Sequence, residues 1–371
     1  FMKYLEISVT KWPSCFFFLF LCSSLAAGDC IETRAAFDFG SGSTKIKVAK
    51  VDTCKRKILE VLYSQSTPLK LKDFLIKRGS SFFLQEEIIN KLSAVTTKLK
   101  KIAIDLKTDR FIGVATEVFR FTENGSDALK KVEDILGIDV FLIDQKTEGH
   151  LGAIAARVAL EEKVKRPEME DKELLVWDIG GGSMQITSMK DADYFSTNGV
   201  EVYEGKLGSV VFKKMIINSL QKKDTTKVNS PNPIGLHHAF YAIDYAREYA
   251  LAIPQRFREK IAKKEVVVLG ISGVHKNSIM VPLKKEVPGF YNIEDVSGLV
   301  KTFAKYQDHQ MKDPPFSDVQ ASNQLLVYGF MKSLGLKKVY VLDTNLSSAL
   351  LVYPVNEVKD LILKDMNTTV K

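Results

Sequence analysis

The sequence predicts an α/β fold made of two related domains, and three observations support this prediction. The chain has 371 residues, which corresponds to about two domains of ~150 residues each. Apolar runs of strand length alternate with segments of helical periodicity, as in layered α/β proteins. An apolar strand that carries an aspartate and ends in a Gly/Ser turn occurs twice, at residues 36–43 and at residues 176–183.

The composition excludes several classes of protein. Apolar residues make up 45% of the chain and charged residues 26%, which excludes a disordered chain, a collagen and a polytopic membrane protein. The formal charge of +8 is spread along the chain, without a long basic run or interleaved aromatic residues. We therefore expect no nucleic-acid partner, whereas binding of small polyanions is compatible with this charge.

Residues 1–28 have the pattern of a secretory signal peptide. A basic region is followed by the apolar core 15–22 and then by small residues, with expected cleavage near Ala27 or Gly28. The apolar core is shorter than the ~20 residues of a transmembrane helix. We expect a periplasmic or secreted mature chain that is not membrane-bound; an uncleaved N-terminal anchor is the alternative.

Cleavage there leaves two cysteines in the mature chain, Cys30 and Cys54. The segment between them predicts a hairpin with strands at 34–39 and 45–51. If the midpoint of this hairpin is Gly42, the two cysteines face each other at its open end. In an oxidising compartment this placement predicts a disulfide, and two free buried thiols are the alternative.

The segment after the hairpin alternates helix and strand patterns. Apolar residues three and four positions apart predict helices at 86–106 and 127–136. Short apolar runs predict strands at 111–115 and 140–143. The second run leads into the alanine-rich segment 149–160, which predicts another helix.

The second half repeats this alternation after a charged linker. Residues 163–172 contain Pro167 and predict a loop. We assign residues 31–146 to a first domain and 147–344 to a second, with a C-terminal helix at 345–365 joining the first domain. Within the second domain we expect strands at 174–179, 184–187, 265–269 and 338–342, helices at 206–220, 237–263 and 321–336, and a polar loop at 222–233.

The two Gly/Ser turns indicate a phosphate-binding site. Glycines let backbone N–H groups converge on an anion, and serine hydroxyls add donors. Neither turn is a P-loop or a dinucleotide fingerprint. Because the two turns lie one domain length apart, we expect the two domains to clamp a phosphate chain. The predicted phosphate-binding residues are Gly40, Ser41, Gly42, Ser43 and Thr44 in the first turn and Gly180, Gly181, Gly182 and Ser183 in the second.

Several motifs resemble known families. D-F-G-S-G-S-T-K and D-I-G-G-G-S resemble the two phosphate motifs of the acetate kinase, sugar kinase, Hsp70 and actin superfamily. Residues 114–127, V-A-T-E-V-F-R-F-T-E-N-G-S-D, are similar to the A-T-x-x-x-R-x-x-x-N segment of the exopolyphosphatase and guanosine pentaphosphate phosphatase (Ppx/GppA) family. Residues 140–158 resemble its acidic motif, 206–210 its L-G-[SA]-V element and 268–273 its later glycine turn. The resemblance, from about residue 34 to 352, implies two actin-like (ribonuclease H-like) domains with an interdomain cleft and a phosphoanhydride hydrolase activity.

The resemblance and the chemistry of this reaction imply roles for individual side chains. Hydrolysis requires a chain of negative charge to be positioned and neutralised and a water to be aimed at it. We expect Mg²⁺, or Mn²⁺ in its place, to bridge carboxylates to phosphate oxygens. Glu148, which opens a helix behind a strand, is the first choice for the general base and Glu117 is the second. We expect Asp38, Asp178 and Glu148 to be metal ligands and Arg120 to contact phosphate. Gln185 is expected to orient the attacking water. A distal glycine turn with Gly270 and Gly273 is expected to recognise the nucleotide or the end of the phosphate chain.

Two departures from the family pattern leave the substrate open. The second turn continues as Met184-Gln185 where the family usually has Thr-Glu, and S-x-Q-I-T resembles secreted apyrases. The leading substrates are polyphosphate and (p)ppGpp-like or other nucleoside polyphosphates. The alternatives are an apyrase-like nucleoside tri/diphosphate hydrolase and a non-catalytic sensor that binds phosphate chains. The sequence leaves open whether the chain forms a homodimer.

Overall fold

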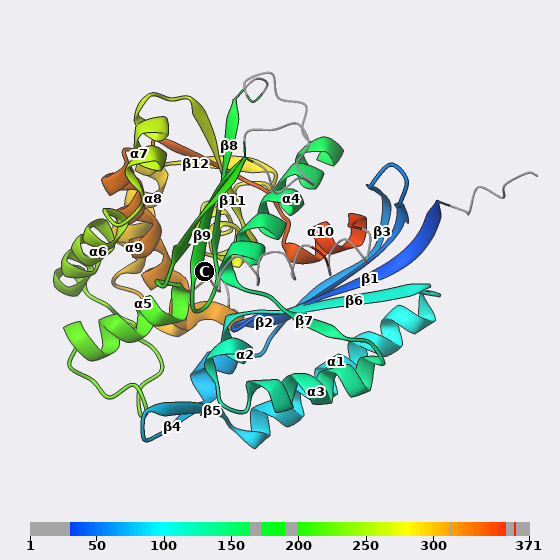
Figure 1. The fold of residues 1–371 in the computed structure, drawn as a ribbon. Helices are drawn as coiled ribbons and strands as arrows, with labels where there is room; N and C mark the ends of the chain where they lie inside the picture. The colour runs from blue at the N-terminus through cyan, green and yellow to red at the C-terminus, as the bar shows by residue number, and fades with distance from the viewer. Residues whose placement is uncertain are drawn as a thin grey trace, which may run out of the picture.

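The predicted α/β fold with two sheet-containing domains is confirmed in the computed structural model (Figure 1). The structure describes residues 30–163, 169, 172–189, 199–311, 314–353 and 360. The predicted signal peptide, most of the 163–172 linker and most of the predicted C-terminal helix beyond residue 353 lie outside the described residues. Within the described parts of the chain, no helix combines the length and the apolar character that a membrane span requires.

The first domain is built on a five-stranded sheet with the order β3-β2-β1-β6-β7. Strands β1, β2 and β3 are antiparallel, whereas β6 and β7 continue from β1 in parallel. Helices α1 and α3 pack together, and the first-domain core includes Phe37, Leu92 and Val132. The elements are β1 (Ile31–Phe39), β2 (Ser43–Asp52), β3 (Lys57–Pro68), β6 (Arg110–Ala115), β7 (Val140–Leu142), α1 (Glu86–Asp105), α2 (Glu117–Phe121), α3 (Gly125–Leu136), the 3₁₀ turn η1 (Leu71–Phe74) and a separate hairpin, β4 (Leu75–Arg78) and β5 (Ser81–Leu84).

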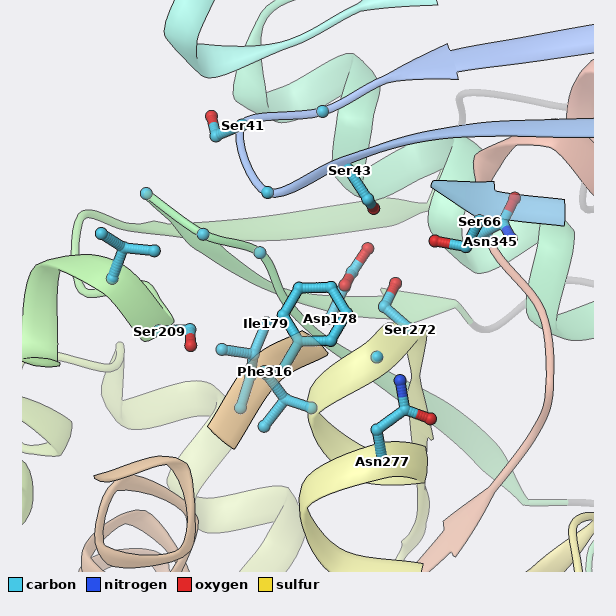
Figure 2. Close-up of a pocket in the computed structure, with 18 of the residues that line it drawn as sticks. Ser41, Ser43, Ser66, Asp178, Ile179, Ser209, Ser272, Asn277, Phe316 and Asn345 are labelled. Atoms are coloured by element: carbon cyan, nitrogen blue, oxygen red, sulfur yellow. The ribbon is translucent and has the colours of Figure 1, made fainter. Parts of the chain in front are cut away.

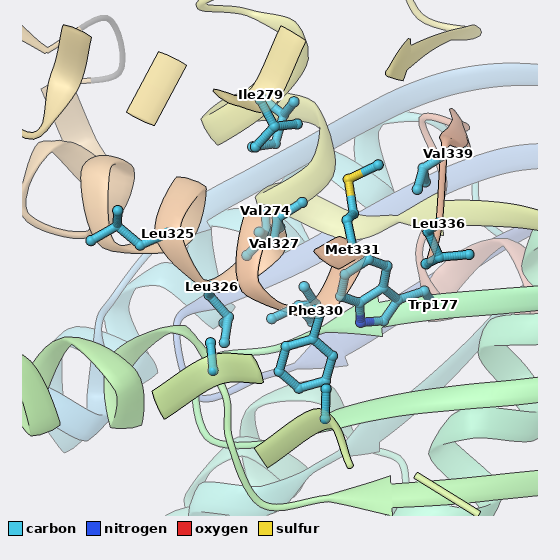
Figure 3. Close-up of a cluster of buried hydrophobic side chains, with 14 of the residues drawn as sticks. Trp177, Val274, Ile279, Leu325, Leu326, Val327, Phe330, Met331, Leu336 and Val339 are labelled. Carbon is cyan, nitrogen blue, oxygen red and sulfur yellow. The ribbon is translucent and has the colours of Figure 1, made fainter. Parts of the chain in front are cut away.

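The second domain repeats this arrangement in a six-stranded sheet with the order β10-β9-β8-β11-β13-β12. Its first five strands match those of the first sheet in order and direction, and β12 adds an antiparallel edge. Trp177 on β8 stacks on Phe330 of α9, with ring centroids 5.6 Å apart, in a large apolar cluster (Figure 3). The strands are β8 (Glu173–Ile179), β9 (Met184–Met189), β10 (Val200–Gly205), β11 (Val266–Ile271), β12 (Gly289–Asn292) and β13 (Lys338–Val341). The helices are α5 (Ser209–Met215), α6 (Leu236–Ala250), α7 (Gln255–Ala262), α8 (Ile293–Phe303) and α9 (Ser317–Leu334), with π-helical turns η3 (Ile216–Leu220) and η4 (Val274–Met280) and 3₁₀ turns η5 (Asp308–Gln310) and η6 (Pro314–Phe316).

Two helices connect the domains. Helix α4 (Gln145–Lys163) packs on β8, β9 and β10 of the second sheet and against α10 (Leu346–Val352), which in turn packs on β1 and β2 (Figure 1). The Arg34 guanidinium on β1 donates to the carbonyl of Leu351 at 2.9 Å and to that of Tyr353 at 2.6 Å. The end of the described chain therefore returns to the first domain. The exact domain boundary near residue 146 stays a prediction.

The duplicated turns share one geometry. Phe39 pairs with Thr44 at the end of the first hairpin, and Ile179 pairs with Met184 at the end of the second. In each turn the N–H of the first glycine donates to a serine carbonyl, at 3.1 Å for Gly40 and 2.9 Å for Gly180. The sequence repeat is therefore also a repeat of backbone conformation.

The Cys30–Cys54 disulfide is present, although the hairpin register differs from the expected one. Ile31 pairs with Asp52, so the midpoint lies between residues 41 and 42 and Thr53, rather than Cys54, opposes Cys30. The Cα atoms of the two cysteines are nevertheless 5.5 Å apart, within the ~4.4–6.8 Å that a disulfide spans. The two cysteines therefore form the disulfide from positions that are offset by one residue across the strands, and not from directly opposite positions as we expected.

Several predicted helices have different bounds in the structure, and two of these differences have a clear cause in the backbone. The single helix expected at 237–263 is wrong, because α6 ends at Ala250 and α7 begins after Pro254. Proline has no N–H for the intrahelical ladder and is tolerated only at a helix start. The helix expected from residue 206 begins at Ser209, since Gly208 is held in an extended conformation against the second turn.

Candidate active site

A cavity of about 210 Å³ lies between the two sheets and is lined by both Gly/Ser turns (Figure 2). Residues from β1, α2, α4, β8, the turn after β11 and the segment before α10 also line it. The sequence-predicted residues that the structure brings together here are Asp38, Gly40, Ser41, Gly42, Ser43, Glu117, Glu148, Asp178, Gly180, Gly181, Gly182, Ser183 and Gly273.

The two turns lie close together across the domain boundary, so that a single added methyl group would fill the gap between them. A methyl group placed on Gly181 would lie 3.4 Å from Cβ of Ser41 and 3.5 Å from the backbone nitrogen of Gly42. The structure therefore has a closed cleft in which donors from both turns reach one small space. An anion bound between them would be shared by the two domains.

Helix α5 fixes the second turn. The N–H groups of Ser209 and Val210 donate to the carbonyls of Gly180 and Gly181 at 2.9 and 2.8 Å. A methyl group on Gly208 would lie 2.5 Å from the carbonyl carbon of Gly182, so only glycine permits this contact. Because α5 donates hydrogen bonds to the carbonyl oxygens of the turn, the N–H groups of the turn are left to bind an anion.

Three buried carboxyl groups meet at the floor of the cavity. Asp38 and Asp178 occupy equivalent positions, one residue before the ends of β1 and β8. The Lys45 ammonium donates to Asp38 Oδ2 at 2.7 Å, and the Ser272 side chain hydrogen-bonds Asp178. Glu148, in the first turn of α4, has a buried Oε2 that accepts no hydrogen bond from the described residues.

Burial controls the protonation of these acids. Burial raises the pKa of Glu148 to about 8; the Arg120 charge opposes this rise, while the charges of Asp178 and Asp38 reinforce it. Burial likewise raises the pKa of Asp178 to about 6, against the hydrogen bond from Ser272 and the charge of Lys45. Burial would lower the pKa of Lys45, but Asp38 outweighs it and the pKa lies above its ordinary value. Such raised carboxyl pKa values mark a site that favours added positive charge.

The residues present fit a divalent cation held partly through waters. Glu148 Oε2 is buried and, among the residues that the structure describes, has no hydrogen-bond donor, only the Arg120 ion pair. Together with the nearby charges of Asp38 and Asp178, it provides oxygen ligands and negative charge. The carboxylate oxygens of these three acids are not all within 4.8 Å of one another. Among the described residues, only Cys30, Asp52 and Cys54 bring three possible ligand atoms that close together, and both cysteines are in the disulfide. Mg²⁺ commonly keeps several of its waters and tolerates such spacing.

Glu117 lies at the other side of the cavity, between the two turns. Its Oε2 accepts from the Ser41 hydroxyl at 2.9 Å, and its Oε1 accepts from the Lys72 ammonium at 2.6 Å. A methyl group on Gly182 would lie 2.3 Å from both Glu117 Oε2 and Lys72 Nζ. Both oxygens of Glu117 thus accept hydrogen bonds, whereas Glu148 Oε2 accepts none from the described residues and has the Arg120 ion pair at 3.5 Å.

Four predicted site residues do not line the cavity. Arg120 donates to the carbonyl of Ile143 and lies 3.5 Å from Glu148 Oε2, so it contacts the acid rather than the cavity. Gln185 is buried on β9, with Nε2 3.4 Å from the Ser183 hydroxyl. Direct roles for these side chains in substrate binding stay predictions. The other two are Thr44, which is buried on β2, and Gly270, whose missing side chain makes room for the His275 ring.

The sequence reasoning missed several cavity residues. Lys45 ends the motif D-F-G-S-G-S-T-K, so its position beside the turn was a usable signal. Phe316 and Asn345 gave no local signal, because they reach the cavity only through the packing of α9 and α10 (Figure 2). The other missed lining residues include Ser66, Lys70, Asp73, Ser209, Ser272, Asn277 and Asp318.

Comparisons with known proteins agree with the fold that carries this cavity. The model of the Ppx/GppA phosphatase family matches residues 48–229. A Ppx/GppA family structure from Aquifex aeolicus has a TM-score of 0.63 and 19% identity, covering 89% of this chain and 98% of its own. An exopolyphosphatase from Cytophaga hutchinsonii has a TM-score of 0.66 and 15% identity, covering 86% and 96%. An exopolyphosphatase-like protein has a TM-score of 0.67 and 18% identity, covering 87% and 97%. At these identities the structures establish the actin-like fold; no curated protein sequence gives a significant match.

Proposed function

We propose that this chain, which belongs to the Ppx/GppA phosphatase family, releases the terminal phosphate of polyphosphate or of a nucleoside polyphosphate. One observation supports the proposal most strongly: both Gly/Ser turns line a single cavity together with Glu148, whose buried Oε2 accepts no hydrogen bond within the described part of the chain. The turns bind the chain of negative charge, and the carboxyl group is placed to receive a proton. Phosphoanhydride hydrolysis needs both of these functions.

In the proposed reaction, water attacks the terminal phosphorus and the bond to the bridging oxygen breaks. The attacking water gives a proton to Glu148, whose pKa of about 8 lies close to that of an efficient base near neutral pH. Donors in the turns around Ser41 and Ser183 hold the phosphoryl oxygens, and the Lys45 ammonium adds positive charge beside Asp38. The leaving group is a phosphate chain shortened by one unit.

A divalent cation, Mg²⁺ or Mn²⁺, would neutralise charge on the phosphate chain when bound. We propose Asp38, Asp178 and Glu148 as the residues that hold it, in part through waters. The Ser272 hydrogen bond fixes the orientation of Asp178 for this role. Lys45 and Arg120 supply two positive charges to these three carboxyl groups, so the cation complements them rather than duplicating them.

An apolar wall favours nucleoside tri/diphosphate hydrolysis as the second candidate. Phe316 is half-buried and lines the cavity together with Ile179, Val210 and Val274 (Figure 2). A half-exposed aromatic ring beside a phosphate site can stack on a base. Polyphosphate would leave this wall without a function, whereas a nucleotide would use it.

The experiment is phosphate release by the purified mature protein. The substrates are polyphosphate, ATP, ADP, guanosine pentaphosphate and pyrophosphate, each with Mg²⁺ and with chelator. Cation-dependent release from polyphosphate or guanosine pentaphosphate supports the first proposal, and a clear preference for ATP and ADP supports the second. Tight binding of polyphosphate without release from any substrate would instead identify a non-catalytic sensor.

We further propose that the mature chain is exported after cleavage near Ala27 or Gly28. The Cys30–Cys54 disulfide supports this, because disulfides persist in oxidising compartments. Fractionation of expressing cells, with the mass of the N-terminal peptide, tests it. An uncleaved chain in the cytoplasm would contradict the proposal.

A further inference from the structure

Residues 69–74, which follow β3 and include η1, lie directly against the first phosphate turn. We call them the strap. The N–H groups of Leu69 and Lys70 donate to the carbonyl of Gly42 at 3.1 and 2.8 Å, and the N–H of Lys72 donates to the carbonyl of Ser41 at 3.4 Å. The strap therefore holds two residues of the turn through backbone hydrogen bonds.

Side chains of the strap also reach the second domain. The Lys70 ammonium donates to Asp318 on α9 at 2.6 Å. Asp73 accepts from the Lys213 ammonium of α5 at 3.2 Å, and Lys213 donates to Asp318 as well, at 2.7 Å. The Lys214 ammonium donates to the carbonyl of Lys72 at 2.9 Å. The Lys70–Asp318, Lys213–Asp73 and Lys214–Lys72 contacts join the two domains and require them to be closed, whereas the Lys213–Asp318 pair lies within the second domain.

The ion cluster is well shielded from solvent. The Lys213 side chain is fully buried, and that of Asp318 is 8% exposed. Burial would raise the pKa of Asp318, but the charges and hydrogen bonds of Lys213 and Lys70 outweigh it and the pKa lies below its ordinary value. On opening, Lys70 and Asp73 would lose their partners in the second domain while Lys213 and Asp318 would stay paired with each other, so the shielded cross-domain pairs favour the closed arrangement.

The strap also holds Glu117. The Lys72 ammonium donates to Glu117 Oε1, and Glu117 Oε2 accepts from Ser41 in the turn that the strap supports. Gly182 of the second turn packs against this Lys72–Glu117 pair. The position of Glu117 between the turns is thus tied to the strap and, through the strap, to the second domain.

We propose that residues 69–74 are a positioning element that couples closure of the cleft to the placement of Glu117 and of the first phosphate turn. Lys70 and Lys72 are positioning residues in this scheme, and Lys214 acts on them from the second domain. The catalytic consequence rests on the proposed function, because it assumes that the first turn and Glu117 serve hydrolysis. The mechanical coupling itself does not depend on which substrate is used.

Lys214→Gln is the sharpest test, because Lys214 contacts the strap without lining the cavity. Its side chain is 34% exposed, so the variant is expected to fold with a near-wild-type melting temperature. Lys70→Gln removes the positive charge that pairs with Asp318 of the second domain, and Lys70→Arg should restore this ion pair. Lys77→Gln on β4 is the matched control: it removes one exposed positive charge outside the strap.

The first readout is hydrogen exchange of the substrate-free protein, measured by mass spectrometry. Lys214→Gln and Lys70→Gln should increase exchange at residues 40–44 and 69–74 several-fold, whereas Lys70→Arg and Lys77→Gln should not. Unchanged exchange at residues 40–44 in both glutamine variants would overturn the coupling. A change in Lys70→Gln alone would overturn the proposed action of Lys214, since its contact with the strap would then have no effect.

The second readout is catalysis. Both glutamine variants should lower kcat on the best substrate by about tenfold, with a smaller change in KM, as expected when a shared set of charged hydrogen bonds positions the site. A rise in KM confined to Lys70→Gln would show simple phosphate binding and overturn the positioning role. If the wild-type protein releases no phosphate but the exchange results hold, the proposed function fails while the coupling stands.

Discussion

Replacing Glu148 by glutamine tests the base assignment. Glutamine keeps the size and polarity of the side chain but cannot accept a proton from water at neutral pH. We expect kcat to fall by about 10²-fold or more, the usual contribution of a general base, with little change in substrate binding. Glu265→Gln, which removes an exposed carboxylate at the start of β11, is the control and should retain wild-type activity.

The pH profile gives this prediction a magnitude. With a pKa of about 8, Glu148 is ionised in roughly one molecule in ten at pH 7 and in half of the molecules at pH 8. At limiting Mg²⁺ the wild-type rate should therefore rise about fivefold between pH 7 and pH 8. Higher Mg²⁺ should move this rise to lower pH, because a bound cation favours the ionised carboxylate.

The assay is phosphate release from saturating substrate between pH 6 and pH 9 at two Mg²⁺ concentrations. Glu148→Gln should lose the rise with pH as well as the rate. A variant that keeps near-wild-type activity and the same pH profile would refute the assignment. The base would then be Glu117 or a group outside the proposed set.

The remaining predictions concern the cation, the second turn, the disulfide and pH. Asp178→Asn should raise the Mg²⁺ concentration for half-maximal activity at least severalfold; a titration that overlays the wild type would contradict its role as a ligand. Gly182→Ala should reduce kcat/KM by more than tenfold, because a methyl group there meets the ion pair of the first domain at 2.3 Å, and steady-state kinetics with a control melting curve measures this. Replacing Cys30 and Cys54 by serine should lower the free energy of unfolding by about 3 kcal/mol, the chain-entropy value for a loop of this size. Urea denaturation measures this change, and an unchanged midpoint would contradict it. Without divalent cations, stability should fall as pH rises from about 4.5 to about 8, since folded Glu148 keeps a proton that the unfolded chain loses; thermal melts should show Mg²⁺ reducing this slope.

The repeated unit was predictable from sequence because its signal is local. The aspartate, the glycines and the serines of each turn are adjacent in the chain, and their backbone geometry needs no distant partner. The same locality explains why β1, β2, β8 and β9 were placed correctly by apolar strands and turn residues. The repeat then predicted two related domains that clamp a phosphate chain between them.

The rest of the site depends on contacts between distant residues. Lys213 and Asp73 are 140 positions apart, and Lys70 and Asp318 are 248 apart. No window of sequence predicts such pairs, and both lysines look like ordinary solvent-facing residues of a lysine-rich chain. Phe316 is another case, since only the packing of α9 brings it to the cavity.

Competing local rules explain the errors in the elements. The apolar spacing of residues 237–263 predicts one continuous helix, but Pro254 divides it. The exposed edge strand β3 was missed because its side chains are mostly polar or half-exposed and show no buried run. In both cases the pattern of apolar residues was a weaker guide than backbone hydrogen bonding.

Substrate binding between the two turns can be seen directly in a crystal structure of the protein with Mn²⁺ and a non-hydrolysable imidodiphosphate chain. Phosphoryl groups should lie between the turns at residues 40–43 and 180–183. An anomalous Mn²⁺ peak should lie among Asp38, Asp178 and Glu148. An anion bound outside this cavity, or Mn²⁺ bound away from all three carboxylates, would contradict the proposed site.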